Sequence, residues 1–449
     1  MAAPLRPLLG LPGNRLRSGA MLKVLDLRGL APGQRPALPR PDVTGDDSVA
    51  TVQAIIAAVR RGGDEAVRAY TARFDRAEIG DLGVPLAAAL SARDRIDPVL
   101  LDSLTEAGNR IEAFHRHRPS LPPAFECAGV RVERLDLPVA RAAVYVPGGR
   151  ARYPSSVLMM AIPAKVAGVG ELVLCTPPGP DGLISDEVLA AASLAEVDEI
   201  YRIGGAQAIA ALAYGTESIR PVDVIASAGS RWVSIAQEEV RGVVGVPAAF
   251  AGPSEVVVVA DDTAPPECAA IDVVVQAEHG PDGLAWLVTW SEGALEAINA
   301  AMGRYVEHAP RRAEITSTLS RGGYAVLVDG PAQAMEVANE IAPEHLELLC
   351  AGAEGLVGAV RNAGAVFIGP WTPASLGDYL AGPSHVLPTF RSARFASALG
   401  VEDFLRRVHV VKTDQAGLAV AAPHVKAIAE AEGLFAHAES VAVRARLTA

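Results

Sequence analysis

The sequence predicts an α/β protein built from two consecutive Rossmann-like domains, with a helical N-terminal segment and a helical C-terminal tail. From about residue 130, short apolar runs alternate with alanine-rich stretches whose apolar residues recur at helical spacing. The apolar runs are nearly continuous, as in the strands of a parallel sheet that helices cover on both faces. This alternation occurs in two successive series, which places the two predicted domains at residues 130–250 and 251–380.

The segment before these domains is expected to be mostly helical. Residues 1–20 contain three arginines and no acidic residue, and we expect a disordered extension, or a true start near Met21. Residues 21–129 are expected to be helical and to pack in part on the α/β core. Within them, a helix is predicted to begin near Asp46 and to be stopped by Gly62.

Residues 381–449 are predicted to form a loop followed by a helical tail. A helix is expected over residues 423–432, opened by Pro423 and ended by Gly433. Glu432 and His437 are five positions apart, about 140° around an unbroken helix. Only a helix stop at Gly433 would therefore let these two side chains converge on one site.

The bulk properties of the chain limit the classes of function open to it. Its 449 residues, half of them hydrophobic, are enough for two or three domains with sizeable cores. No run of about 18 uncharged apolar residues is present, so no membrane span is expected. The net charge of −12 argues against a nucleic-acid partner, which would require clustered lysine and arginine. Four cysteines without a C-x-x-C pair fit a reducing cytoplasm, and none is assigned to chemistry.

The stretch "VVQAEHGPD", residues 274–282, ends a helix predicted over residues 265–279. Gln276 and His279 are three positions apart and share a helix face, whereas Glu278 points to a different side. An amide oxygen and an imidazole are acceptable ligands for zinc. The alternative is a histidine placed favourably at the negative end of a helix dipole, and this stretch taken alone favours that alternative.

A second candidate cluster is "IAPEHLELL", where Glu344 and His345 stand side by side at the beginning of a predicted strand. Loops at strand ends host chemistry in open α/β sheets, and an adjacent carboxylate and imidazole suit acid–base catalysis. The alternative is a solvated strand start. A third cluster, "GDYLAGPSHVLPT", places Asp378 and His385 in a loop rich in glycine and proline.

Dinucleotide binding is only weakly indicated by the residues themselves. In "YRIGGAQAIAALAYG" a predicted strand, Gly204 and Gly205 precede a helix, a geometry that can offer backbone N–H groups to a phosphate. The stretch lacks the G-x-G-x-x-G pattern, and no acidic residue is evidently placed for a ribose. An ordinary scaffold is the favoured interpretation of this stretch on its own.

Seven blocks of the sequence, taken in order, resemble those of the histidinol dehydrogenase family: "VYVPGGRARYPSSVLMMAIPAKVAGV", "IGGAQAIAALAYGTE", "AGPSEVVVVAD", "QAEHGPD", "APEHLEL", "LGDYLAGPSHVLPT" and "EGLFAHAESV". The resemblance extends from about residue 22 to the C-terminus. It implies a cytoplasmic, NAD-dependent, zinc-containing homodimer of two incomplete Rossmann-like domains, the first on the NAD side and the second on the metal and substrate side. It also implies that the C-terminal tail crosses to complete the site of the partner subunit.

The resemblance implies roles for individual residues, carried over motif by motif. Zinc would be held by Gln276, His279, Asp378 and, from the other subunit, His437. Substrate would be contacted by these four residues and by Ser254, His345 and Glu432. NAD would be contacted by Tyr145, Gln207 and Ser230. In the implied oxidation of L-histidinol to L-histidine through the aldehyde, His345 would accept the alcohol proton and Glu344 would activate water.

Several positions depart from the family pattern, mostly on the coenzyme side. Ser230 stands where the family has an asparagine, and the following "AQEEV" lacks the usual positive charge. Ser384 also replaces a common asparagine, and the usual Ser-Gln pair after Asp282 is absent. Two alternatives therefore stay open: a paralogue that oxidises another primary alcohol, and a catalytically impaired zinc-binding scaffold.

Overall fold

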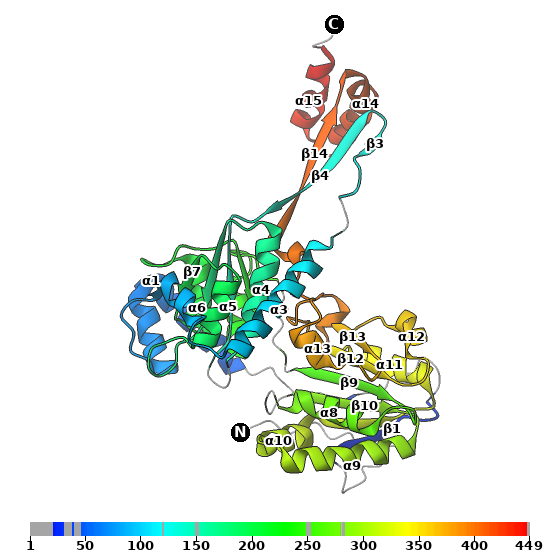
Figure 1. Ribbon diagram of the computed structural model, residues 1–449. Coiled ribbons are helices and arrows are strands. Elements are labelled where there is room, and N and C mark those ends of the chain that lie inside the picture. The colour runs from blue at the N-terminus through cyan, green and yellow to red at the C-terminus, as the bar shows by residue number, and fades with distance from the viewer. Residues whose placement is uncertain are drawn as a thin grey trace. The chain divides into compact units, whose positions relative to one another are not determined.

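The computed structural model describes residues 21–30, 38–39, 46–118, 121–148, 152–247, 252, 254–278, 280 and 283–446. The chain divides into two compact units (Figure 1). The larger combines the chain up to Arg116 with Ala140–Asp403 and contains two sheets, and the smaller combines His117–Val139 with the chain from Phe404 onward. The predicted disordered extension, residues 1–20, lies outside the described residues. The two sheets confirm the predicted α/β class, while the domain boundaries stay a prediction.

The sheet of the second predicted domain has six strands, all parallel. Their order across the sheet is β1 (Lys23–Asp26), β11 (Gly323–Leu327), β10 (Leu284–Thr289), β9 (Glu255–Ala260), β12 (His345–Leu349) and β13 (Ala365–Ile368). The edge strand β1 was not predicted, because it comes from the segment that the sequence suggested was helical. A four-residue strand that pairs on one side only leaves a weak pattern in the sequence.

Helices cover both faces of this sheet. Side chains of each strand alternate between the faces, so Val258 belongs to a core with residues of α8 (Pro266–Ala277) and Val257 to a separate core with residues of α11 (Pro331–Ile341). Helix α10 (Arg312–Gly322) was not predicted, and α12 (Ala353–Leu356) is a single turn followed by a short 3-10 helix. The helices here are α8 (Pro266–Ala277), α9 (Glu292–His308), α10 (Arg312–Gly322), α11 (Pro331–Ile341), α12 (Ala353–Leu356), η1 (Val357–Ala359) and α13 (Ala374–Tyr379).

The sheet of the first predicted domain has five strands, of which only the edge strand β2 is antiparallel. Their order is β2 (Gly83–Val84), β7 (Glu199–Tyr201), β6 (Glu171–Cys175), β5 (Arg141–Tyr145) and β8 (Val224–Ser227). The helix predicted to stop at Gly62 instead kinks at Gly63, whose φ is +50°, and a second helical stretch follows. The helices of the predicted domain are α4 (Pro154–Ala167), α5 (Asp186–Leu194), α6 (Gly205–Tyr214) and α7 (Arg231–Val240). Three helices of the preceding segment pack against them: α1 (Asp46–Phe74), α2 (Leu86–Ala92) and α3 (Pro98–Arg116).

The smaller unit is an antiparallel sheet with two helices. Strand β4 (Val130–Pro138) pairs along its whole length with β14 (Leu405–Thr413), β3 (Phe125–Cys127) adds a third strand, and α14 (Gln415–Ala431) packs on α15 (Phe435–Ala445). The expected start of the tail helix at Pro423 was wrong. Asp414 caps α14 by accepting the N–H of Gly417 at 2.8 Å, and Pro423 lies inside the helix. The expected stop at Gly433, with φ of +72°, is confirmed.

Among the described residues, no helix combines the length and the apolar character needed to cross a bilayer.

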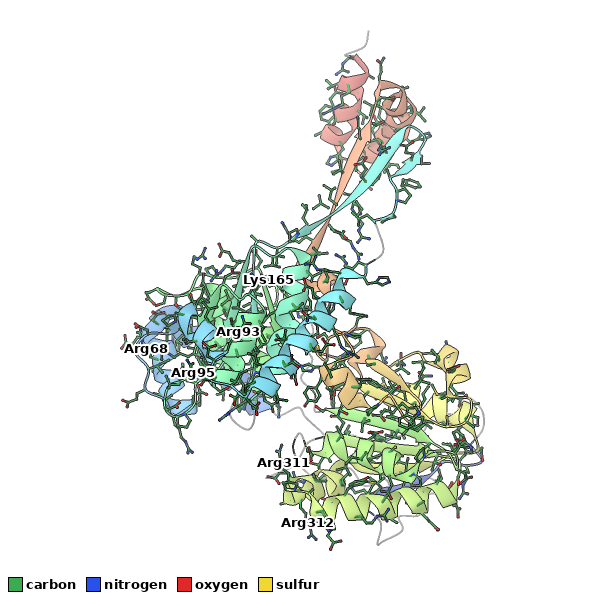
Figure 2. All side chains as sticks on the ribbon, in the orientation of Figure 1. Arg68, Arg93, Arg95, Lys165, Arg311 and Arg312 are labelled. Carbon is green, nitrogen blue, oxygen red and sulfur yellow. The ribbon has the colours of Figure 1, made fainter. Side chains whose placement is uncertain are left out.

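Several surface cations labelled in Figure 2 lie in ion pairs with acidic side chains. Arg95 lies 2.5 Å from Asp186, and Lys165 lies 2.8 Å from Asp198. The described part of the larger unit also contains two short 3-10 helices, η2 (Ser392–Arg394) and η3 (Val401–Phe404).

The amino ends of three neighbouring strands in the first sheet are joined by one arginine. The Arg141 guanidinium, whose side chain is only 7% exposed, donates to Glu199 at 2.8 Å and to Glu171 at 2.6 Å. Hydrogen bonds from Arg141 lower the pKa of Glu199 from 4.5 to about 2, even though burial opposes the shift. Since that pKa is lower in the folded chain, Glu199 stabilises the fold above pH 4.5, and this contribution is lost as the pH falls towards 2.

We therefore predict that Glu199→Gln destabilises the protein at pH 7 by about 2 kcal/mol, because it removes charge-assisted hydrogen bonds from a buried guanidinium. The thermal midpoint should fall by about 5 °C at pH 7. The difference from wild type should shrink as the pH is lowered from 4.5 towards 2, because wild-type Glu199 loses its contribution over that range.

The matched control is Glu238→Gln, which breaks an exposed ion pair with Arg241. It should change the stability by less than about 0.5 kcal/mol. Equal effects of the two substitutions, or a Glu199→Gln effect that does not vary with pH, would contradict the proposed role of the arginine.

Candidate active site

Those predicted site residues of the second domain that the structure describes gather at the amino edge of its sheet. Glu344 and His345 lie where β12 begins, and Ser254 immediately precedes β9. Helix α8 follows β9 and leads back to the start of the parallel strand β10, so its last turn, with Gln276, returns to the same edge. The sequence indicated only that strand ends host chemistry. In this sheet the site lies at the amino ends of the strands, whereas open α/β sheets generally bind ligands at the carboxyl ends of their strands.

The carboxylate of Glu344 is fixed by the neighbouring strand. Helix α11 ends at Ala342, whose φ of +52° is uncommon for a residue with a side chain, and Pro343 then directs the chain into β12. Glu344 Oε2 accepts the backbone N–H of Glu255 at 3.0 Å, and the Glu344 carbonyl oxygen accepts the N–H of Ala365 at 2.9 Å. The residue is only 7% exposed, so the carboxylate is held in a defined position away from bulk water.

The imidazole of His345 is the centre of the cluster. Its Nδ1 lies 3.2 Å from Gln276 Nε2 and 3.3 Å from the carbonyl oxygen of Glu255, and its Nε2 lies 3.3 Å from Asp378 Oδ1. Glu344 Oε2 lies 3.7 Å from Nδ1. The ring also stacks on Phe367 with 5.9 Å between centroids. The structure thus brings Glu344, His345, Gln276 and Asp378 together.

Burial and neighbouring charges determine the protonation of this pair. Burial raises the pKa of Glu344 to about 7, because His345 and the N–H of Glu255 offset only part of the desolvation. Burial alone would lower the pKa of His345, but the charges of Glu344 and Asp378 outweigh it and raise this pKa to about 9. Glu344 therefore exchanges its proton near neutral pH beside a protonated imidazole, and a carboxyl–imidazole contact shielded from water can perform general acid–base chemistry.

The other candidate metal ligands are partly described. Gln276 is 1% exposed, and its Oε1 has no hydrogen-bond partner among the described residues. The Asp378 backbone carbonyl accepts from His385 Nδ1 at 2.8 Å, and His385 Nε2 lies 3.0 Å from Ser156 Oγ. His279 lies outside the described residues, within which no group of three His, Cys, Asp or Glu side chains could hold a metal.

The remaining predicted substrate residues are in two places. Ser254 is half-buried, and its carbonyl oxygen accepts the N–H of Leu284 at 3.0 Å. Glu432 and His437 belong to the smaller unit, where Glu432 ends α14 and His437 lies in the first turn of α15. Both of these side chains are exposed on that unit.

The predicted coenzyme residues lie on the first sheet, at the carboxyl ends of its strands. Tyr145 ends β5, and its buried hydroxyl accepts the N–H of Gly205 at 3.0 Å. Gln207, in the first turn of α6, is 1% exposed, and neither of its amide atoms has a partner among the described residues. Ser230 is exposed and precedes α7 without capping that helix through its side chain.

The sequence reasoning missed several buried groups around the site. Glu255 accepts the N–H of Phe390 at 3.1 Å, and Asp272 and Glu347 lie buried between the strands and α8. Each of these acids interrupts an apolar run, as in "AIDVVV" and "HLELL". Since buried carboxylates are rare unless they are paired, an acid inside such a run could have indicated them.

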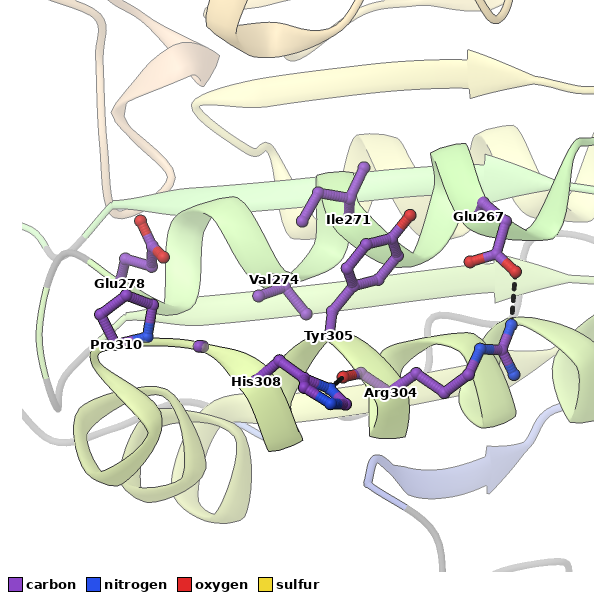
Figure 3. Close-up of a pocket in the computed structure, with 9 residues that line it drawn as sticks. Glu267, Ile271, Val274, Glu278, Arg304, Tyr305, His308 and Pro310 are labelled. Carbon is purple, nitrogen blue, oxygen red and sulfur yellow. Dashed lines mark hydrogen bonds and ion pairs between the residues drawn. The ribbon is translucent and has the colours of Figure 1, made fainter.

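A surface groove of about 510 Å³ between α8 and α9 is separate from this site (Figure 3). It is lined by Ile271, Tyr305 and His308, by the ion pair of Arg304 with Glu267, and by Glu278. Glu278 is exposed to the groove while Gln276 is buried, which confirms that these two side chains point to different sides of the helix.

Two largely parallel sheets covered by helices, one of them with a buried carboxylate–imidazole pair at a strand end, are typical of enzymes of the Rossmann-like class. The family model of histidinol dehydrogenase matches residues 38–445. Histidinol dehydrogenases of Synechococcus sp. and Moorella thermoacetica are each 45% identical to this chain, over 90% and 88% of its length and 94% of theirs. The chain belongs to the histidinol dehydrogenase family. The crystal structure of histidinol dehydrogenase from Elizabethkingia anophelis matches with a TM-score of 0.90 and 31% identity, covering 96% of this chain and 100% of that one.

The position of Asp378 depends on close packing of its neighbour. A Cβ atom on Gly377 would lie 2.5 Å from the ring of Phe367, the ring that stacks on His345. We predict that Gly377→Ala displaces either Phe367 or α13, costs about 1–3 kcal/mol of stability, and lowers kcat/KM by at least about tenfold.

Gly355→Ala is the matched control in the same domain, since a Cβ there would meet no atom within 4 Å. It should leave both the thermal midpoint and kcat/KM near wild type. If the Gly377 substitution were equally silent, the packing of Phe367 between Gly377 and His345 would not position the site.

Proposed function

We propose that the protein is an L-histidinol dehydrogenase that oxidises L-histidinol to L-histidine through the aldehyde, with two NAD and one zinc ion per subunit. The observation that supports this most is the buried contact of Glu344, His345, Gln276 and Asp378 in a member of this family. The proposed reaction transfers two hydrides in succession, first from the alcohol carbon and then from the hydrated aldehyde carbon.

The acid–base steps are assigned to the residues at the amino end of β12. In the first step, the neutral imidazole of His345 accepts the proton that the alcohol oxygen loses. A cation held by Asp378 would offset one of the negative charges that otherwise keep His345 protonated. In the second step, Glu344 takes a proton from the water that attacks the aldehyde carbon. Glu344 is suited to this because one carboxylate oxygen is fixed by the N–H of Glu255. The closed surroundings of the pair keep other water away from the aldehyde.

Zinc would be held by Gln276, His279 and Asp378, together with His437 of the partner subunit. The buried Oε1 of Gln276, which has no partner among the described residues, fits such a role, since an orphaned buried oxygen is costly without a ligand. When bound, the metal would supply a Lewis acid that orients the substrate and exchanges no electrons.

NAD would be contacted by Tyr145, Gln207 and Ser230, and when bound it would supply the hydride acceptor. The buried amide of Gln207, unpartnered within the described part of the chain, fits a role in binding a polar ligand. Ser230 has a shorter reach than an asparagine, so its contact with the coenzyme should be weaker than the asparagine usual in the family.

The tail is proposed to complete the site of a second subunit in a homodimer located in the cytoplasm. The smaller unit exposes large apolar side chains on its sheet and both of its helices, including Val411, Ile428 and Phe435 at 65%, 62% and 78% exposure. Apolar surface of this extent is typical of a protein contact.

The function is tested by supplying purified, zinc-loaded protein with L-histidinol and NAD and counting NADH per histidine formed. A ratio of about two supports the proposal. Turnover of another primary alcohol but not of histidinol, or metal binding without turnover of any alcohol, would contradict it.

We predict that Glu344→Gln retains some oxidation of the alcohol but blocks the second step, because an amide cannot accept the proton of the attacking water. The ratio of NADH to histidine should rise well above two as aldehyde accumulates. Normal production of histidine by this variant would refute the role assigned to Glu344.

A shared site also predicts complementation between two defective variants. In a dimer of one Glu344→Gln subunit and one His437→Ala subunit, one site has both substitutions and the other has neither. Free exchange of subunits should therefore restore about a quarter of the wild-type rate of histidine formation. A mixture no more active than the average of its two components would mean that His437 serves its own subunit.

A further inference from the structure

Two buried carboxyl groups lie on the helix that contains Gln276 and on the strand that contains His345. Asp272 of α8 and Glu347 of β12 are 6% and 1% exposed, and their carboxyl groups interact with each other. Glu347 Oε2 has no hydrogen-bond donor among the described residues, so a proton on one of the two carboxyl groups would supply it. Two carboxylates can share a hydrogen bond only if one of them holds a proton. Burial, and then the contact with Asp272, raise the pKa of Glu347, and burial also raises the pKa of Asp272, so the pair shares a proton at neutral pH.

The pair joins three elements that each provide one residue of the site. Asp272 lies one helical turn before Gln276 on α8, and Glu347 lies two positions after His345 on β12, on the same face of the strand. Glu347 Oε1 also accepts the N–H of Ala374 at 3.1 Å. Ala374 begins α13, which contains Asp378 one turn later.

We propose that the Asp272–Glu347 pair is a positioning device that fixes the spacing of Gln276, His345 and Asp378 and thereby determines the affinity of the site for zinc. This inference depends on the metal site of the proposed function. Neither carboxyl group is itself a ligand. Glu347 acts through the amino end of α13, and Asp272 acts through the helix that contains Gln276.

Two substitutions at Glu347 separate the hydrogen bonds from the volume of the side chain. Glu347→Gln retains an oxygen that accepts from Ala374 and gains an amide that donates to Asp272. Glu347→Leu has a similar volume and removes both bonds. We expect zinc affinity near wild type for the glutamine variant and at least about tenfold weaker for the leucine variant, measured by competition with a chromogenic chelator.

A third variant removes the hydrogen bond between Ala374 and Glu347 by changing its donor. Ala374→Pro replaces the donating N–H by a CH2 group, and the first residue of a helix tolerates proline. The preceding Pro373 already has the extended ψ of 155° that a residue before proline requires. Ala374→Pro should therefore weaken zinc binding by at least about tenfold, while the thermal midpoint of the metal-free protein falls by less than that of Glu347→Leu.

The matched control is Asp261→Leu at the opposite edge of the same sheet. Asp261 accepts the N–H of Ala351 at 3.0 Å and so also joins two strand ends, far along the strands from the site. It should lower the thermal midpoint without changing zinc affinity. If wild type, Glu347→Leu and Ala374→Pro bind zinc equally, the positioning role is refuted. If wild type binds no zinc, the proposed metal site fails and this inference fails with it.

Discussion

The site depends on one hydrogen bond between the amino ends of two neighbouring strands, from the N–H of Glu255 to the carboxylate of Glu344. Parallel pairing of β9 with β12 sets His345 opposite Val256, so Glu344 comes level with Glu255. The Glu344 carboxylate accepts the N–H of Glu255, as a backbone carbonyl would do if the strand pairing continued by one more residue. The sheet register therefore places the carboxylate, and the following residue places the imidazole beside it. The crossover helix α8 then brings Gln276 to the same edge.

An excess of buried negative charge follows from this arrangement. The carboxyl groups of Glu344 and Asp378 lie against the imidazole of His345, and Glu255, Asp272 and Glu347 are further buried acids on β9, α8 and β12. Buried charges must be paired, protonated or bound to a cation. The raised pKa values of Glu344 and Glu347 show that protons meet part of this need. A divalent cation at Gln276 and Asp378 would meet the rest, which is why the proposed zinc suits the electrostatics as well as the donor atoms.

Much of the fold could be predicted from the sequence, because continuous apolar runs such as "EVVVVA" and "AWLVT" have few alternatives to buried parallel strands. The helices α8, α9 and α11 had clear starts and stops. Strand β1 and the long β4–β14 pair could not be predicted, because short or exposed strands are decided by partners far away in the sequence. The predicted start of α14 was wrong because the prediction placed Pro423 as the first helical residue, whereas the helix begins after the N-cap residue Asp414.

The site was predictable only in part, and for a physical reason. Adjacent residues such as Glu344 and His345 can be recognised together, whereas Gln276 and Asp378 are brought to them by tertiary structure. The buried acids Glu255, Asp272 and Glu347 were not predicted as part of the site, because in the sequence each one is a single charged residue inside or at the start of an apolar segment. Their effect comes from contacts between elements, which a single sequence does not display.

The central claim is that the amino edge of the second sheet holds the metal, and anomalous diffraction at the zinc edge tests it most directly. Crystals of zinc-loaded protein should show one strong peak per subunit within about 2.0–2.2 Å of Gln276 Oε1 and an Asp378 carboxylate oxygen. A peak elsewhere, or none at this edge of the sheet in protein that contains zinc, would contradict the account.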